Sequence, residues 1–350
     1  MRGSFLGGSS SPIEFPSRIA FVLSPSNLYS NTFSGVVRQA LTWADRLRDV
    51  GITVDFPACH ETKSWSTYDL VHIFQYGSWA EGLIRNLTSA GVPVFLSPIV
   101  DRPKVYGWRG KLVAQIPFER LGLEQRQRVL YRHALASRAI LARSELEARS
   151  LESLGIPRSA ICIVRLGVDV ARDQLTIPTR KSPHVFHMSH LNQIRKNVPA
   201  LIAACRQVGA PLRLAGKISD PCFAAWLEKE CESDPNLKYL GTLSEAQKWD
   251  ELRQAHVFGL PSLNEGIGLV ALEAHLAGAH VIMTKRSGGI DYFDGEVEVC
   301  DPESTADIAR CLRIALSKPA LEGPRLKSLT QLSSEVANQE LLRVYAREKA

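Results

Sequence analysis

The sequence has no long uninterrupted apolar run. Among its 350 residues, no stretch reaches the roughly 18 to 20 apolar positions that a membrane-spanning helix requires, and the N-terminus lacks the hydrophobic run of a secretory signal. We therefore expect a cytoplasmic protein, acting in solution or peripherally at the inner membrane face.

Cysteine is sparse and unpatterned. The seven cysteines form no CxxC pair and show no metal-ligand spacing, and an odd number argues against a disulfide framework. We expect reduced core cysteines and no bound metal.

Basic residues are not clustered either. The 42 Lys and Arg residues against 36 Asp and Glu give a net charge of +6, but they are spread along the chain and are not gathered with aromatics as in nucleic-acid-binding segments. Nucleic acid is therefore not an expected partner. A mild positive balance suits phosphorylated ligands or an anionic membrane surface.

Strand-like and helix-like segments alternate along most of the chain. "RIAFVLSP" (18–25), a helix at 35–51 and "ITVDF" (52–56) open a βαβ pattern, which restarts with "HVFHMSHL" (184–191) after a polar linker. The alternation predicts an α/β protein with two doubly wound, Rossmann-like domains built on parallel sheets. The expected divisions are a flexible leader at 1–15, an N-terminal domain at 16–175, a C-terminal domain at 176–332 and an amphipathic terminal helix at 333–350.

Two helix starts carry capping signals. Ser144 precedes a helical segment with Glu147 at the capping-box position and Gly155 as its terminator, and Ser244 opens a second capping box in "SEAQ". In contrast, "DRPKVYGWRGK" (101–111) is interpreted as a variable loop.

The stretch "NEGIGLVALEA" (264–274) joins the strand-like "FGLPS" to a helix. In open α/β sheets, ligands bind at this point, outside the carboxyl end of a strand. Two glycines allow close backbone approach, and the free N–H groups that follow lie at the positive end of the helix dipole. The pattern predicts a phosphate cradle made by Gly266, Ile267, Gly268, Leu269 and Val270.

Glu265 and Glu273 flank this cradle. Glu273 lies on the same helix face as Leu269, about 6 Å further along the axis, an offset that suits the ribose hydroxyls of a nucleotide. Glu265 precedes the helix and is placed to reach a sugar beyond the phosphates. The alternative is that Glu265 only compensates the helix dipole and Glu273 is a solvated surface residue.

A leaving nucleoside diphosphate gathers negative charge, so a site without metal needs fixed cations and N–H donors. Lys196, with Arg195 beside it, stands between a strand end and a helix start and is the candidate. The alternative is a solvated surface pair.

The segment "EGIGLVALEAHLAGAHVIMTKRSGG" resembles the Glu-x7-Glu signature of retaining GT-B glycosyltransferases of family four, because both glutamates, both early glycines and the distal Gly288 and Gly289 stand at the expected spacing. The resemblance implies a GT-B fold, with two sheets facing a central cleft, the donor on the C-terminal domain and the acceptor on the N-terminal one. It implies that Glu273 contacts the ribose and that Glu265 contacts the donor sugar. It also implies that the terminal helix crosses back to the N-terminal domain.

Other parts of the chain resemble the same family. "SGVVRQALTWADRLRDVGITVDF" is similar to the family's first glycine loop and helix, which implies that Gly35 meets the donor. "HMSHLNQIRKN" is similar to the segment that clamps the diphosphate, and implies contacts from His190, Arg195 and Lys196. "LAGK" and "YLGTLSE" resemble strands that flank the nucleobase pocket, which implies donor contacts at Gly216 and Leu243.

The sequence departs from the family pattern in both halves. His190 stands where the family usually has an arginine, and Ser189 replaces a glycine. Ile99 stands where the family often has a histidine near the reacting sugar, with Asp101 two residues later as a polar substitute. His72, in the strand-like "VHIF", is a candidate catalytic residue or, alternatively, a buried structural histidine.

These features lead to a retaining glycosyltransferase that moves a hexose-like sugar from a nucleoside diphosphate to a hydroxyl of a glycan or lipid-linked acceptor, with no cofactor beyond the donor. The resemblance implies a front-face mechanism, in which the departing phosphate oxygen deprotonates the acceptor. The alternatives are a noncatalytic nucleotide-sugar-binding partner of another transferase, and a GT-B sugar epimerase or phosphorylase. Basic and aromatic residues at 102–109 make an anionic membrane a further candidate partner; the alternative is a solvated loop.

Overall fold

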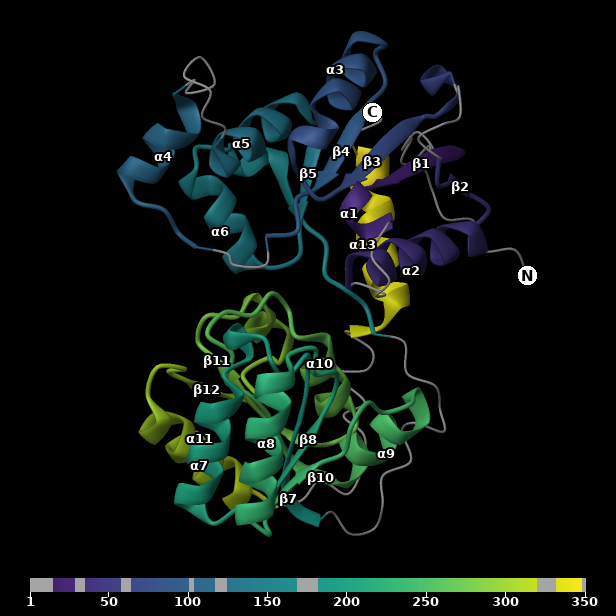
Figure 1. The fold of residues 1–350 in the computed structure, drawn as a ribbon. Coiled ribbons are helices and arrows are strands. Elements are labelled where there is room, and N and C mark those ends of the chain that lie inside the picture. Colours follow the sequence, from purple (N-terminus) through teal and green to yellow (C-terminus); the bar gives the residue numbers. More distant parts are fainter. Residues whose placement is uncertain are drawn as a thin grey trace, which may run out of the picture.

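The computed structural model describes two α/β domains, each built on one parallel sheet. The described residues are 15–28, 35–57, 64–100, 104–116, 125–168, 182–319 and 332–347. Figure 1 shows the domains one above the other, with the chain passing between them after β6. The expected pair of doubly wound parallel sheets is therefore confirmed. The expected leader and the junction near residue 175 lie outside the described residues.

The N-terminal sheet has six strands in the order β2-β1-β3-β4-β5-β6, all paired in parallel. Its strands are β1 (Arg18–Leu23), β2 (Thr53–Asp55), β3 (Leu70–Phe74), β4 (Val94–Ser97), β5 (Ala139–Ala142) and β6 (Ile161–Ile163). The helices around it are α1 (Pro25–Leu28), α2 (Gly35–Asp49), α3 (Glu81–Ser89), α4 (Trp108–Gln115), α5 (Arg126–Ala136) and α6 (Glu145–Ser153). Every residue of β3 and β4 is buried, as expected where helices cover both faces of a parallel sheet.

The C-terminal sheet has the order β12-β11-β10-β7-β8-β9 and is also parallel. Its strands are β7 (Ser182–Met188), β8 (Leu212–Ala215), β9 (Leu237–Tyr239), β10 (Ala255–Leu260), β11 (His280–Thr284) and β12 (Val297–Cys300). The helices are α7 (Val198–Val208), α8 (Pro221–Ser233), α9 (Glu245–Gln254), α10 (Leu269–Leu276) and α11 (Thr305–Ser317), with short 3-10 turns η6 (Ile194–Lys196) and η7 (Gly288–Tyr292).

The terminal helix α13 (Ser334–Arg347) packs on the N-terminal domain. In Figure 1 it is the yellow helix that runs beside α2. Tyr345 on this helix is 1% exposed and lies in the same apolar cluster as Phe21 and Phe95. Burial of a large aromatic side chain therefore attaches the end of the described chain to the first sheet.

Several local predictions can be compared with the structure. Ser144 caps α6 as expected, and Gly155 follows it with a φ of 97°, but the Glu147 carboxylate accepts from the backbone N–H of Arg143 and not from that of Ser144. The capping box at Ser244 is complete. The loop prediction for 101–111 was wrong over its last residues, because α4 begins at Trp108.

Candidate functional site

The segment NEGIGLVALEA (264–274) follows β10, a central strand of the C-terminal sheet, and ends in α10. Gly268 has a φ of 76°, a left-handed conformation that favours glycine. A Cβ there would also lie 2.9 Å from the terminal methyl carbons of Leu260 and Met283, which would have to shift. The N–H groups of residues 266–270 donate to no acceptor in the part of the chain that the structure describes. They are therefore hydrogen-bond donors without an intramolecular acceptor, at the start of a helix.

A second backbone segment lies against this loop. A Cβ on Gly289 would be 1.9 Å from the carbonyl oxygen of Ile267, and Glu265 and Ser287 form an isolated parallel bridge. Gly288 in turn lies against Ser144 of the N-terminal domain. The two distal glycines thus let η7 pack directly on the motif and let the N-terminal domain approach it.

Glu265 is buried and surrounded by donors. Its Oε2 accepts from Lys196 Nζ at 2.7 Å and from Ser262 Oγ at 2.9 Å, and Arg195 lies 3.5 Å from Oε1. Burial alone would raise the pKa of Glu265, but the two cations and the hydroxyl outweigh it and hold the pKa below its usual value. Glu265 is therefore ionised at neutral pH. The structure thus brings three predicted site residues, Glu265, Lys196 and Arg195, together.

Glu273 is also buried, with 4% of its side chain exposed, and so is not the solvated residue of the alternative interpretation. Lys248 Nζ lies 2.9 Å from its Oε2, and Arg38 of the N-terminal domain lies 3.7 Å from its Oε1. Lys248 is itself shared with Glu245 at 2.6 Å. The sequence analysis did not identify Lys248 or Arg38. The only feature that could have indicated them is that each lies in the first turn of a helix, Lys248 in α9 and Arg38 in α2.

A cavity of about 100 Å³ opens beside Glu273, between the two domains. It is lined by the first turns of α2, by the segment after β6, by α10 and by the start of α13, through residues that include Arg38, Trp43, Leu166, Leu269, Glu273 and Ser334. Glu273 is the only carboxylate in this lining. The carboxylate therefore faces an interdomain space, as binding of a ligand in the cleft requires.

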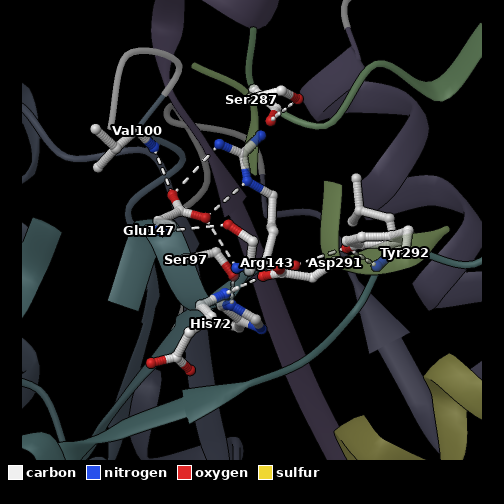
Figure 2. A network of polar contacts seen from close by, with 12 residues as sticks. His72, Ser97, Val100, Arg143, Glu147, Ser287, Asp291 and Tyr292 are labelled. Carbon is white, nitrogen blue, oxygen red and sulfur yellow. Dashed lines mark hydrogen bonds and ion pairs between the residues drawn. The ribbon is translucent and has the colours of Figure 1, made fainter. Parts of the chain in front are cut away.

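A polar network joins the domains near this cavity (Figure 2). Tyr292 Oη of η7 donates to the carbonyl oxygen of Arg143 at 2.6 Å and accepts from the N–H of Leu166 at 2.9 Å. Glu147 holds the Arg143 guanidinium at 3.0 Å and also accepts from the N–H of Val100 at 2.6 Å. One chain of hydrogen bonds thus runs from the C-terminal domain to the loop after β4.

The remaining predicted donor contacts are more dispersed. His190 bonds to Ser219 Oγ at 2.9 Å. A Cβ on Gly216, whose φ is 125°, would lie 1.8 Å from the Ser189 carbonyl oxygen, so the backbones of these two loops touch. Leu243 is half-buried just before α9, and Gly35 begins α2 with open space around it. None of these four residues contacts Glu265 or Glu273 through a hydrogen bond or ion pair in the described structure.

His72 occupies the core and not the cleft. It is 0% exposed, and its ring nitrogens bond to Tyr345 Oη at 2.6 Å and to Ser97 Oγ at 2.8 Å. Burial lowers its pKa to about 3, so the ring is neutral at physiological pH. A side chain enclosed in this way has no contact with a ligand in the cleft, so the structure favours the buried structural alternative, and we remove His72 from the catalytic candidates.

Two features of the described residues bear on possible ligands and surroundings. No helix among them is long and apolar enough to cross a membrane. No group of three or more His, Cys, Asp and Glu side chains within the same ranges is arranged to hold a metal ion. Asp101, the possible substitute near Ile99, lies outside the described residues.

Comparison with known proteins identifies relatives of this arrangement. Residues 172–333 match the family described as glycosyl transferases group 1. Glycogen synthase from two Mycobacterium tuberculosis strains, CDC 1551/Oshkosh and ATCC 25618/H37Rv, is 28% identical over 192 residues, which cover 51% of this chain and 45% of the relative. The chain thus spans about half the length of the curated relatives it matches.

Solved structures resemble nearly the whole chain. Anabaena HepE in complex with UDP and glucose superimposes with a TM-score of 0.68 and 14% identity, covering 95% of this chain and 100% of that one. Sucrose-phosphate synthase from Thermosynechococcus elongatus gives a TM-score of 0.69 and 15% identity, covering 95% and 98%. At such identities the likeness shows the fold alone, and the fold is GT-B.

Proposed function

We propose that the chain, whose residues 172–333 match the glycosyl transferases group 1, transfers a sugar from a nucleoside-diphosphate sugar to a hydroxyl of a glycan or glycolipid acceptor, with retention of the anomeric configuration. The observation that carries the proposal is the row of N–H groups at 266–270 that have no acceptor among the described residues, flanked by two buried glutamates. Such a row binds anions, and the flanking acids accept hydrogen bonds from sugar hydroxyls.

Each part of the site has a proposed partner on the donor. The amides at 266–270 and the cations Lys196 and Arg195 take the diphosphate, Glu273 takes the ribose and Glu265 orients the transferred sugar. A uridine donor is supported by the similar fold of HepE, which was solved with UDP and with UDP-glucose. His190, Gly216, Leu243 and Gly35 complete the proposed donor set.

The proposed reaction is a front-face displacement. The bond between the anomeric carbon and the diphosphate oxygen breaks, and its electron pair stays on that oxygen. The acceptor oxygen bonds to the same face of the sugar, and its proton passes to the departing phosphate oxygen. Fixed cations and oriented amides stabilise the charge that develops on the diphosphate, so the protein needs no side chain acting as a base.

The decisive experiment measures binding and turnover separately. UDP-glucose, UDP-galactose and GDP-mannose are titrated by calorimetry, and release of free nucleotide is followed with and without saccharide acceptors. Saturable donor binding with retained configuration in the product supports the proposal. Tight binding with no turnover on any acceptor indicates the noncatalytic partner, release driven only by inorganic phosphate indicates a phosphorylase, and isomerised donor indicates an epimerase.

We further propose that the segment 104–116 contacts an anionic membrane. Trp108 is 72% exposed, and Val105 and Leu112 are also exposed. Lys104, Arg109 and Lys111 lie among them, and the segment contains no acidic residue. Exposed apolar side chains next to cations, with no acid among them, favour contact with an anionic lipid surface. In Figure 1, α4 lies at the outer edge of its domain.

Vesicle co-sedimentation tests this contact. Vesicles with 30% phosphatidylserine, roughly a physiological anionic content, are expected to retain the protein, and 0.5 M salt is expected to release it because salt screens charges. Trp108→Ser should weaken binding several-fold, whereas Leu135→Ser, which changes an exposed apolar residue on α5, should not. Equal binding to uncharged vesicles would contradict the proposal.

A further inference from the structure

Lys248 occupies a position that general preferences disfavour for a lysine. Only 5% of its side chain is exposed, and it lies in the first turn of α9, whose N-cap is Ser244. The free N–H groups at a helix start carry partial positive charge and disfavour a cation, and lysine is almost never fully buried unless it is paired. A lysine that is retained against both preferences requires a specific contact.

Two carboxylates provide that contact from different helices. Lys248 Nζ lies 2.6 Å from Glu245 Oε1 on its own helix and 2.9 Å from Glu273 Oε2 on α10. Glu245 is 60% exposed, whereas Glu273 is 4% exposed. Water can solvate Glu245 without help from the lysine, but a buried carboxylate needs a partner. Glu273 is therefore the group that depends on Lys248.

Lys248 reaches Glu273 without occupying the cavity between the domains. The lining of that cavity, as far as the structure describes it, includes Glu273 but not Lys248. The contact is an ion pair and not a hydrogen bond, because Glu273 Oε2 accepts no hydrogen bond from any described residue. Lys248 thus holds the carboxylate in place and leaves its capacity to accept hydrogen bonds for another donor.

The lysine is itself held by its neighbours. Its ammonium lies 5.2 Å from the centroid of the Trp249 ring, and Trp249 Nε1 donates to the same Glu245 oxygen at 3.0 Å. Trp249 is 2% exposed. A lysine has a flexible four-carbon stem, so contacts with a carboxylate and with a packed aromatic ring limit its movement. The position of Lys248 therefore restricts that of Glu273.

The other cation near Glu273 is placed differently. Arg38 Nη1 lies 3.7 Å from Glu273 Oε1, and 54% of the Arg38 side chain is exposed. A half-exposed pair at this distance contributes little, because water screens it. Arg38 also belongs to the other domain. Lys248 is thus the contact that fixes the Glu273 carboxylate within its own domain.

We propose that Lys248 is a positioning residue for donor recognition: it fixes the Glu273 carboxylate in the orientation that accepts hydrogen bonds from the ribose hydroxyls. An acceptor that is already fixed avoids the cost of ordering a side chain when the ligand binds. The inference rests on the proposed function, because the ribose role of Glu273 does, and it adds a residue that the donor itself does not touch.

The test compares UDP, 2′,3′-dideoxy-UDP and pyrophosphate by calorimetry on the full chain. The unmodified protein is expected to prefer UDP over the dideoxy nucleotide by about tenfold or more. Lys248→Met keeps an unbranched side chain without the ammonium, and should reduce this preference to about threefold or less by weakening UDP alone. Lys248→Arg, which restores a cation, should retain most of the preference. Lys229→Met, on the exposed surface of α8, is the matched control and should leave it unchanged.

A double variant tests whether Lys248 acts through Glu273. Lys248→Met leaves a buried carboxylate unpaired, which destabilises the fold, so urea unfolding is measured first. Lys248→Met/Glu273→Gln has no such carboxylate and is compared with Glu273→Gln alone. A residue that acts through Glu273 has nothing further to remove in that background, so the two variants should show the same preference. A further loss in the double variant would overturn the positioning role.

The remaining outcomes separate this inference from the proposed function. If Glu273→Gln lowers the preference for UDP but folded Lys248→Met does not, Lys248 is only a structural pair, so the inference is refuted and the proposed function stands. If folded Lys248→Met weakens all three ligands equally, the site is distorted as a whole and the inference fails as well. If the unmodified protein does not bind UDP, the proposed function fails and this inference falls with it.

Discussion

Replacing Glu273 by glutamine tests the ribose role directly. The side chain keeps its shape but loses its charge, in a position where 4% of it is exposed and Lys248 lies 2.9 Å away. A carboxylate accepts hydrogen bonds from both vicinal hydroxyls of a ribose, whereas the amide has a single acceptor oxygen. The change therefore removes one charge-assisted hydrogen bond and weakens the other.

The expected magnitude follows from these contacts. A hydrogen bond to a charged group contributes about 1.5–3 kcal/mol, so the affinity for UDP should fall about 10- to 150-fold, at 1.4 kcal/mol per decade. Stability should fall as well, because removing one partner of a buried ion pair costs about 3–5 kcal/mol. Lys248 retains Glu245 at 2.6 Å, so we place the loss of unfolding free energy below that range, at about 1–3 kcal/mol.

The assay uses two ligands. UDP contains the ribose, whereas inorganic pyrophosphate engages only the cradle, so calorimetry should show weakened UDP binding and unchanged pyrophosphate binding in Glu273→Gln. Glu228→Gln, on the exposed surface of α8, is the matched control. Urea unfolding of each variant confirms that a folded protein is being titrated. Unchanged UDP affinity in a folded variant, or equal losses for both ligands, would refute the ribose role.

Three further changes have distinct expected outcomes. Lys196→Met should weaken UDP and pyrophosphate alike by about 10- to 100-fold, about 1.4–3 kcal/mol, and selective loss of one ligand would show that Lys196 does not hold the phosphates. Gly289→Ala should abolish binding of both ligands, because its Cβ would lie 1.9 Å from the Ile267 carbonyl oxygen; full activity would show that η7 is free to shift. His72 has a folded-state pKa of about 3 against an ordinary 6.5, so protons bind only the unfolded chain between these values and stability falls as pH decreases, by about 1.4 kcal/mol per pH unit. Urea unfolding of His72→Gln at pH 6.5 and pH 5 should show a smaller dependence of the unfolding free energy on pH than in the unmodified protein. An unchanged pH dependence would contradict the burial argument.

The backbone of the loop that we propose as the donor cradle was predictable because its determinants are local. Gly266 and Gly268 between a strand and a helix specify a close backbone approach and a row of free N–H groups, whatever the rest of the chain does. The pattern of alternating elements specified parallel sheets for the same reason. Ser144 and Ser244 marked their helix starts because a cap needs only the next three residues.

The partners of the two glutamates were not predictable in the same way. Arg38 reaches Glu273 from the other domain, and Lys248 does so from the preceding helix. His72 was ambiguous because its environment is set by Tyr345, 273 residues later. No local pattern marks Ile99 as a residue with positive φ. Such features depend on tertiary packing, which sequence periodicity does not encode.

The lysines paired with the two acids bear on how the proposed site is arranged for a diphosphate. Lys196 and Glu265 form a buried pair at 2.7 Å, and Lys248 and Glu273 form another at 2.9 Å. We infer that Glu265 fixes the position of Lys196 before the donor arrives, so that Lys196 acts on the diphosphate without reorganisation during bond breaking. On this argument Glu265→Gln impairs catalysis through Lys196 as well as through the sugar. Its effect on pyrophosphate affinity, which involves no sugar, measures the first contribution alone.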